Sequence, residues 1–147
     1  MLSVIKDAGA DEKMFTPRAA IDFVSACKNE LISPDEAKQK AAEFREEKLA
    51  SFYKEYQKRL KTANAMDFDD IIVRTVELIG KNEEIRDYLQ GKFRYICVDE
   101  YQDTNHAKFV LVTLLAEKYG NLMVVGDDDQ SIYGFRGADI KNILSFD

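Results

Sequence analysis

The chain has 147 residues, of which 46% are hydrophobic and 33% are charged, and its formal net charge is −6. This length suits one ordinary domain with a buried core, and the composition excludes a disordered chain. No apolar run reaches the roughly 20 residues that a transmembrane helix needs, and the first residues lack the basic-then-apolar order of a secretory signal, so a cytoplasmic protein is expected. The negative charge argues against general electrostatic binding of nucleic acid, but not against a protein that grips DNA with a few placed groups.

The two cysteines, Cys27 and Cys97, each stand among apolar neighbours and form no CxxC pair. Each is therefore predicted to be a buried, reduced thiol. Because His106 is the single histidine and no cluster of cysteine and histidine occurs, a zinc site is not expected.

Helix signals dominate the first two thirds of the sequence. Thr16 followed by Pro17 predicts a helix start, because threonine is a good N-cap and proline suits the first helical position. Ser33 and Glu36 have the spacing of a capping box, which predicts a second start. From there to about Asn64 no glycine or proline interrupts the segment. Its apolar stripe predicts one buried helix face and consists of Leu49, Phe52, Tyr53, Tyr56 and Leu60.

Two further helices are predicted before the pattern changes. One begins at Asp67, and Gly80 is placed to end it. A shorter amphipathic stretch over 83–89 stops at Gly91. The first of these helices has a shared apolar face, formed by Phe68, Ile71, Ile72, Val76 and Ile79.

The last third predicts a βαβ unit. A β-prone run at 93–98 is followed by a helix from Thr104 or Asn105 to Tyr119, and then by a second buried-type strand at 122–125. The strands of such a unit are parallel, and its ligands bind outside their carboxyl ends. The predicted fold class is therefore α/β, mostly helical, with a small parallel sheet.

Polar residues follow both predicted strands at this ligand-binding edge. Asp99 and Glu100 come directly after the first strand, and Gly126 comes directly after the second. One interpretation is that Asp99 or Asp103 caps the helix that follows. The other is that the first acid orients a hydrated Mg²⁺ on a nucleotide, while the second polarises the water that attacks the γ-phosphate.

The segment at 124–139 favours the second interpretation. Its glycines allow tight turns, and Gln130 offers an amide that can donate to a phosphate oxygen. Tyr133 and Phe135 are two residues apart, so an extended chain points both rings to one side, where unpaired bases can stack on them. The alternative is that both rings belong to a core.

The stretches VDEYQDTN at 98–105 and VGDDDQSIYGFRGAD at 125–139 closely resemble motifs II and III of the UvrD/Rep/PcrA-like superfamily 1 DNA helicases. MDFDDII at 66–72 resembles a further segment of that family. The resemblance extends over essentially the whole chain. It implies a helical 1B subdomain at 1–90, followed at 91–147 by part of the first RecA-like ATPase domain.

The resemblance also implies roles for the residues after the strands. Asp99 would handle Mg²⁺ through water, and Glu100 would be the catalytic base for ATP hydrolysis. Gln130 would contact the γ-phosphate and sense its state.

The same resemblance implies a contact with single-stranded DNA. Tyr133 and Phe135 would stack on bases, and Arg136 would make a polar contact nearby. Many relatives have tryptophan where this chain has Phe135. Phenylalanine keeps the stacking face but loses the indole N–H donor, so a weaker grip in the same mode is expected.

Three lysines of the long helical segment form a further candidate DNA contact. Lys54, Lys58 and Lys61 lie on one helix face at i, i+4 and i+7, and the resemblance implies that this subdomain touches duplex DNA. The alternative is a solvated face, which the Glu55 and Arg59 pair at i, i+4 favours.

The family's phosphate-binding loop, GxxxxGK followed by serine or threonine, does not occur in these 147 residues. The Gly-Lys pairs at 80–81 and 91–92 are followed by Asn82 and Phe93. The chain therefore resembles an internal piece of a larger 3′ to 5′ helicase, without ATPase activity of its own. Further strands and the remaining helicase domains would lie outside it, because two parallel strands alone make a poor sheet.

Other readings of the chain stay open. One is a standalone DNA-binding or protein-binding module that derives from a helicase. Another copy of the chain is a second source of the missing strands, because exposed sheet edges favour self-association. The pathway of the parent protein, whether DNA repair, replication or recombination, is not indicated by the residues.

Overall fold

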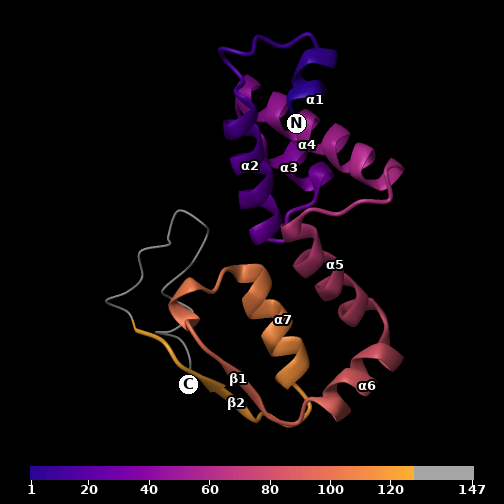
Figure 1. Ribbon diagram of the computed structural model, residues 1–147, viewed down its shortest axis with the longest axis vertical. Coiled ribbons are helices and arrows are strands. Elements are labelled where there is room, and N and C mark those ends of the chain that lie inside the picture. Colours follow the sequence, from indigo (N-terminus) through magenta and orange to yellow (C-terminus); the bar gives the residue numbers. More distant parts are fainter. Residues whose placement is uncertain (128–147) are drawn as a thin grey trace. The chain divides into compact units, whose positions relative to one another are not determined.

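The computed structural model describes residues 1–127, a succession of helices that ends in a strand, a further helix and a second strand paired with the first (Figure 1). Contacts divide the chain into two compact units, unit 1 over Met1–Asp70 and unit 2 from Ile71 on. The predicted α/β, mostly helical class is confirmed. The functional boundary expected near residue 90 stays a prediction. Within residues 1–127, no helix combines the length and the apolar character needed to cross a membrane.

Unit 1 is helical, and its helix starts follow local sequence signals. The Thr16 hydroxyl accepts the Ala19 N–H at 3.2 Å, and Ser33 and Glu36 form the expected reciprocal capping box. The hydrogen bonds from Ser33 lower the pKa of the Glu36 carboxyl. The helices of unit 1 are α1 (Leu2–Asp7), α2 (Pro17–Asn29), α3 (Pro34–Lys40), α4 (Phe44–Thr62) and the start of α5 (Phe68–Lys81).

The segment without glycine or proline contains a break that its composition does not signal. Helix α3 ends at Lys40 because Ala41 is extended, with a ψ of 120°. The chain restarts as α4 at Phe44, and the Glu46 carboxylate accepts the Ala42 N–H at 2.8 Å ahead of the new helix. The break turns α3 back against α4 instead of prolonging it.

Two apolar clusters form the core of unit 1. In one, the rings of Phe15 and Phe52 meet edge-on, with centroids 5.4 Å apart. In the other, Tyr53 packs with Val24 and Cys27. The prediction that Cys27 is buried is confirmed, and burial raises the pKa of its thiol.

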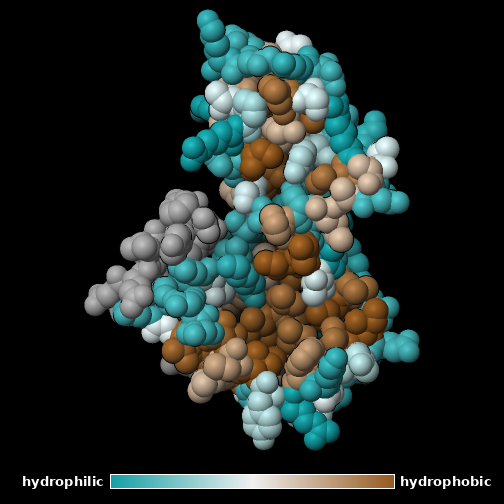
Figure 2. Space-filling model, viewed as in Figure 1, coloured by the Kyte–Doolittle hydropathy of each residue, from teal (hydrophilic) through white to brown (hydrophobic). Residues whose placement is uncertain are grey.

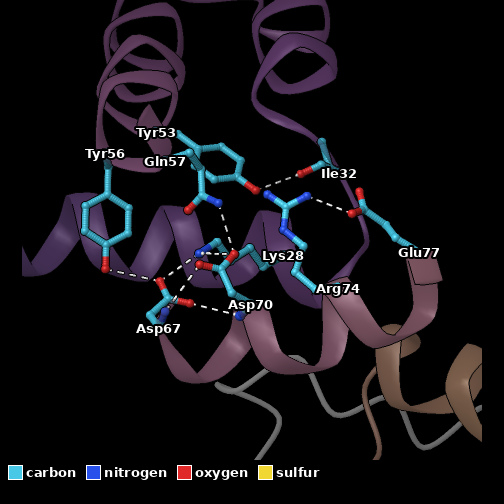
Figure 3. A network of polar contacts seen from close by, with 9 residues as sticks. All are labelled: Lys28, Ile32, Tyr53, Tyr56, Gln57, Asp67, Asp70, Arg74 and Glu77. Carbon is cyan, nitrogen blue, oxygen red and sulfur yellow. Dashed lines mark hydrogen bonds and ion pairs between the residues drawn. The ribbon is translucent and has the colours of Figure 1, made fainter. Parts of the chain in front are cut away.

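A buried polar network joins the start of α5 to α2 and α4 within unit 1 (Figure 3). The Lys28 ammonium lies 2.7 Å from Asp67 Oδ2 and 2.9 Å from Asp70 Oδ1, and the Lys28 side chain is 1% exposed. The Tyr56 hydroxyl donates to Asp67 at 3.1 Å, and the Gln57 amide donates to Asp70 at 3.0 Å. The helix that begins in the MDFDDII segment is therefore held at its start by buried ion pairs with Lys28.

The network shifts two of its own pKa values. Burial alone would raise the pKa of Asp67, but hydrogen bonds from Lys28 and from the Asp70 N–H hold it below its ordinary value. Burial, together with the neighbouring negative charge of Asp67, raises the pKa of Tyr56 to about 12.

Helix α5 differs from its predicted apolar face at the first turn. Val76 and Ile79 are buried, as expected, but Phe68 is 90% exposed and Ile71 is 54% exposed. The reason is that the carboxylate of Asp70, which is 2% exposed, takes the buried side of this turn.

Unit 2 continues from α5 with α6 (Glu83–Lys92), β1 (Ile96–Val98), the 3₁₀ turn η1 (Tyr101–Asp103), α7 (His106–Ala116) and β2 (Leu122–Val124). The two strands pair in parallel, as predicted, with Ile96 opposite Leu122 and Val98 opposite Val124. Gly120, at a φ of +65°, donates its N–H to Ala116 O at 2.8 Å and ends the turn after α7.

Gly80 and Gly91 do not end helices as predicted. Both lie inside them, because α5 runs on to Lys81 and α6 to Lys92. Asn82 separates the two helices instead, and its side chain accepts the Ile85 N–H at 3.0 Å as the N-cap of α6.

The prediction that Cys97 is buried is wrong. Alternation along β1 puts Cys97 on the opposite sheet face from Ile96 and Val98, and its register partner Met123 is 56% exposed. Apolar neighbours in the sequence signalled a covered strand, but within residues 1–127 this face of the sheet stays open to solvent.

Helix α7 is mostly apolar, yet within residues 1–127 it is incompletely covered. Each residue over 109–112 and 114–116 is only half-buried, and Ala107 alone in this helix is fully buried. Figure 2 shows apolar side chains gathered on the visible face of unit 2. A helix with apolar residues all round is normally buried on all sides. The described part of unit 2, residues 71–127, therefore exposes surface of the kind that other elements usually cover.

Candidate functional site

The candidate site begins where the chain leaves β1. Asp99 and Glu100 are both exposed there, and Asp99 Oδ1 accepts the Glu100 N–H at 2.8 Å. Glu100 has a left-handed backbone, with φ 54° and ψ 41°. That conformation costs a residue with a side chain about 1 kcal/mol or more and recurs at functional sites. The bend holds two consecutive carboxylates at the carboxyl edge of the sheet.

Neither Asp99 nor Asp103 caps the helix that follows, so the capping interpretation is wrong for both. Asn105 is the N-cap of α7, and its side-chain oxygen accepts the Lys108 N–H at 3.0 Å. Asp103 lies in the turn η1, where its N–H donates to Glu100 O at 2.9 Å. Its Oδ1 is buried and lacks a hydrogen-bond partner in the described part of the chain. Helix capping therefore leaves the Asp99 and Glu100 carboxylates unexplained.

The segments that follow the two strands run side by side. Val125 donates its N–H to Val98 O at 2.8 Å, and Tyr101 donates its N–H to Val125 O at 2.9 Å. These bonds extend the strand pairing past the ends of β1 and β2. The carboxylates after β1 and the chain after β2 consequently share one edge, as the βαβ pattern predicted.

Gln102 connects these two segments through its side chain. Its Nε2 donates to Glu100 Oε2 at 2.6 Å, and its Oε1 accepts the Asp127 N–H at 3.0 Å. No role was predicted for this residue from the sequence. The available signal was its place two positions after Glu100, inside the VDEYQDTN stretch.

Gly126 has a structural requirement other than the tight turn expected of it. A Cβ at this position would lie 2.8 Å from Gln102 Oε1, and 3.3 Å from both Gln102 N and Tyr101 Cβ. Gly126 is not among the described glycines with positive φ. Close approach to Gln102, and not backbone freedom, therefore explains glycine here.

The remaining residues predicted for this site lie outside the described part of the chain. These are Gln130, Tyr133, Phe135 and Arg136. Their roles toward the γ-phosphate and single-stranded DNA stay predictions.

The lysines of α4 are exposed and partly paired. Lys54 lies 2.7 Å from Asp35, and Lys58 lies 3.9 Å from Glu55. The expected pair of Arg59 with Glu55 is present at 2.9 Å. The face with Lys54, Lys58 and Lys61 thus carries both charge signs, and its contact with duplex DNA stays a prediction.

The donor set after β1 fits Mg²⁺ on a nucleotide better than a metal held by protein alone. Within residues 1–127, no group of three or more His, Cys, Asp or Glu side chains is arranged to hold a metal. Asp99 and Glu100 are two exposed carboxylates, and Mg²⁺ is commonly bound through one or two carboxylates together with water and substrate phosphates. In that pattern, Asp99 and Glu100 would hold the ion together with water and substrate phosphates.

Fold and site together define an α/β protein with acidic residues at the ligand-binding edge of a parallel sheet. The chain belongs to the UvrD/REP helicase family, since the model described as UvrD/REP helicase N-terminal domain matches residues 2–147. It is 52% identical over 144 residues to an ATP-dependent DNA helicase PcrA of Staphylococcus epidermidis, and 51% identical to one of Staphylococcus aureus. The alignments cover 98% of this chain and 20% of each relative, so the chain spans about a fifth of their length.

Proposed function

We propose that this chain is the part of an ATP-dependent DNA helicase that supplies the magnesium-orienting and water-activating carboxylates. The observation that carries the proposal is the fixed bend after β1, where Asp99 and Glu100 stand exposed beside the chain that follows β2. The relatives' name, ATP-dependent DNA helicase, supports the same reaction. The positive φ of Glu100 supports a catalytic role, because strained backbone conformations cluster at active sites.

In this proposal the two acids have separate tasks. Asp99 orients the water shell of Mg²⁺, while Glu100 accepts a proton from the water that attacks the γ-phosphorus. When bound, Mg²⁺ neutralises charge on the β- and γ-phosphate oxygens. Gln130 contacts the γ-phosphate, and Tyr133 and Phe135 stack on single-stranded DNA. Arg136 makes a polar contact next to these rings.

The proposal extends to the rest of the parent protein. Residues 1–90 act as a 1B subdomain, and residues 91–147 belong to the first RecA-like domain of a 3′ to 5′ translocase. Within residues 1–127, α7 and the Cys97 face of the sheet are incompletely covered, which supports further strands and helices supplied by other parts of that protein. Without a phosphate-binding loop in these 147 residues, the chain by itself does not hydrolyse ATP.

The test is a chimera in which this chain replaces the matching segment of the Staphylococcus epidermidis PcrA. We expect DNA-stimulated, magnesium-dependent ATP hydrolysis that Glu100→Gln abolishes. Glu84→Gln, an exposed acid of α6, is the matched control and keeps the activity. A folded chimera that binds DNA without hydrolysing ATP would support a binding module instead. ATPase activity unchanged by Glu100→Gln would also overturn the proposal.

A further inference from the structure

The side chain of Gln102 is almost entirely enclosed, at 2% exposure, although both its neighbours in the network lie at the exposed edge of the sheet. A buried primary amide needs partners for its oxygen and its nitrogen. Gln102 finds them on two different segments, Glu100 after β1 and Asp127 after β2. Gln102 is therefore a direct bridge between the Glu100 carboxylate and the backbone at Asp127, after β2.

The chemistry of the partners fixes which way this amide faces. The carboxylate of Glu100 only accepts hydrogen bonds, and the backbone N–H of Asp127 only donates. Turning the amide over would oppose the Gln102 oxygen to a carboxylate and its NH₂ group to an N–H. Only one orientation of the amide satisfies both contacts. Its NH₂ group must therefore face Glu100, and its oxygen must face Asp127.

Gly126 allows this bridge to form. A methyl group there would meet Gln102 Oε1 at 2.8 Å, closer than carbon and oxygen approach without displacement. The absence of a side chain at Gly126 lets the oxygen reach the next N–H, that of Asp127, at 3.0 Å. Gln102 and Gly126 thus form one matched contact.

We propose that Gln102 is a positioning residue that holds the Glu100 carboxylate and couples its position to the segment following β2. The inference rests on the proposed role of Glu100 as the base for hydrolysis. The bond to the carboxylate is charge-assisted and short, at 2.6 Å, so it restricts the side chain of a residue that is otherwise exposed. A shift of Glu100 moves the amide, and the amide moves the backbone at Asp127, which stands three positions before Gln130 in the sequence.

The coupling is testable in the 147-residue chain by NMR-detected hydrogen exchange of the Asp127 amide. Glu100→Ala removes the acceptor for Gln102 Nε2, so we expect the Asp127 amide to exchange roughly two- to tenfold faster. In the Gln102→Met background, where the bridge is absent, the same Glu100→Ala change leaves that rate unaltered. An equal effect of Glu100→Ala in both backgrounds overturns the proposal.

Gln90 provides a matched control in the same unit. It is also a buried glutamine, at 5% exposure, and its Nε2 donates to Leu114 O at 2.7 Å. In the Gln90→Met background the effect of Glu100→Ala on the Asp127 amide persists. If that effect disappears with Gln90→Met as well, the coupling reflects general loosening of unit 2 and the proposal fails.

A second variant keeps the test decisive if Gln102→Met does not fold. Gln102→Glu retains an oxygen for the Asp127 N–H but loses the donor to Glu100, and it sets two carboxylates side by side. Glu100→Ala then relieves a repulsion, so we expect it to slow exchange at Asp127 instead of speeding it. Exchange that Glu100→Ala still speeds in this background contradicts the bridge.

The ATPase chimera separates this inference from the proposed function. There we expect Gln102→Met to lower kcat about ten- to a hundredfold with an unchanged KM for ATP, because the base is displaced while nucleotide binding is not. Gln90→Met keeps kcat. If Glu100→Gln abolishes hydrolysis and Gln102→Met leaves kcat intact, the positioning role fails alone. If Glu100→Gln has no effect, the proposed function fails.

Discussion

Lys28 and Asp70 form an ion pair inside unit 1, with Nζ 2.9 Å from Oδ1 and side chains that are 1% and 3% exposed. Asp67 completes the site from the same short segment. Both charges are desolvated, so the pair stabilises the fold little more than well-packed apolar side chains would. Loss of one partner, however, leaves the remaining charges buried without compensation. The network is therefore a point where one substitution has a large effect on the helical unit.

Lys28→Met tests this directly. Methionine keeps much of the volume but leaves the Asp67 and Asp70 carboxylates without their cation, and breaking a buried pair costs about 3–5 kcal/mol. Urea unfolding followed by circular dichroism measures the change. Lys54→Met is the control. Lys54 lies 2.7 Å from Asp35, the distance that also separates Lys28 from Asp67, but its pair is on the surface, where ion pairs contribute about 0–1 kcal/mol. Equal losses for both variants would contradict the assigned burial.

Tyr56→Phe is expected to change the alkaline limb of stability. The pKa of Tyr56 is raised to about 12 in the folded chain, above its ordinary value near 10. The proton is thus bound more tightly in the folded state, and this contribution is complete below about pH 10 and is lost as the pH rises toward 12. Stability measured over that range should fall less steeply for Tyr56→Phe.

Tyr88→Phe is the control for this alkaline effect. The ring of Tyr88 is 66% exposed and lies outside the network of Figure 3. The variant should reproduce the slope of the unmodified chain. A Tyr56→Phe curve that coincides with it would mean that the Tyr56 hydroxyl has no special environment.

Local signals in the sequence predicted the helix starts well. Thr16, Ser33 and Glu36 act through contacts three residues away, so the sequence contains the whole interaction. The buried Lys28 was not predicted, because lysine is seldom enclosed and its partners lie 39 and 42 positions later in the chain. One signal was available: Lys28 stands four positions after buried Val24, on the apolar side of α2.

In the candidate site, too, local features were predicted from the sequence and a contact between distant residues was not. Strand order and the place of Asp99 and Glu100 followed from the βαβ pattern, since the carboxyl ends of parallel strands share an edge. The bridge through Gln102 did not follow, because it depends on a contact across 25 positions and on the absence of a side chain at Gly126. Cys97 was misplaced since apolar neighbours do not reveal whether a sheet face is covered.

Charge reversal on α4 tests the duplex DNA contact. If Lys54, Lys58 and Lys61 touch phosphates, the three changes to glutamate should abolish salt-sensitive binding of a fluorescent duplex. Each lost phosphate contact should lower the slope of log K against log salt by about 1. A matched triple reversal of exposed lysines, at Lys13, Lys38 and Lys40, changes net charge equally. Equal effects of both triples would favour the solvated-face interpretation.

Gly126→Ala should destabilise unit 2 in a way that depends on Gln102. The added methyl meets Oε1 of Gln102 at 2.8 Å and displaces the amide from its partners, which costs about 1–3 kcal/mol as overpacking. In the Gln102→Ala background that oxygen is gone. The added methyl then meets only the backbone N of residue 102 and Tyr101 Cβ, each at 3.3 Å. The cost of Gly126→Ala should therefore be smaller there, with an interaction energy of about 0.5–3 kcal/mol in the double-mutant cycle.

Gly91→Ala calibrates the Gly126 measurement. Gly91 lies inside α6 with open space around its Cα, so alanine there should stabilise the chain by about 0.5–1 kcal/mol through helix propensity. Urea unfolding of the single and double variants yields each free energy of unfolding. Additivity of Gly126→Ala and Gln102→Ala within about 0.5 kcal/mol would show that the two residues do not share a contact. A strong deviation from additivity, with Gly91→Ala additive to both, would locate the effect in the bridge between the strand ends.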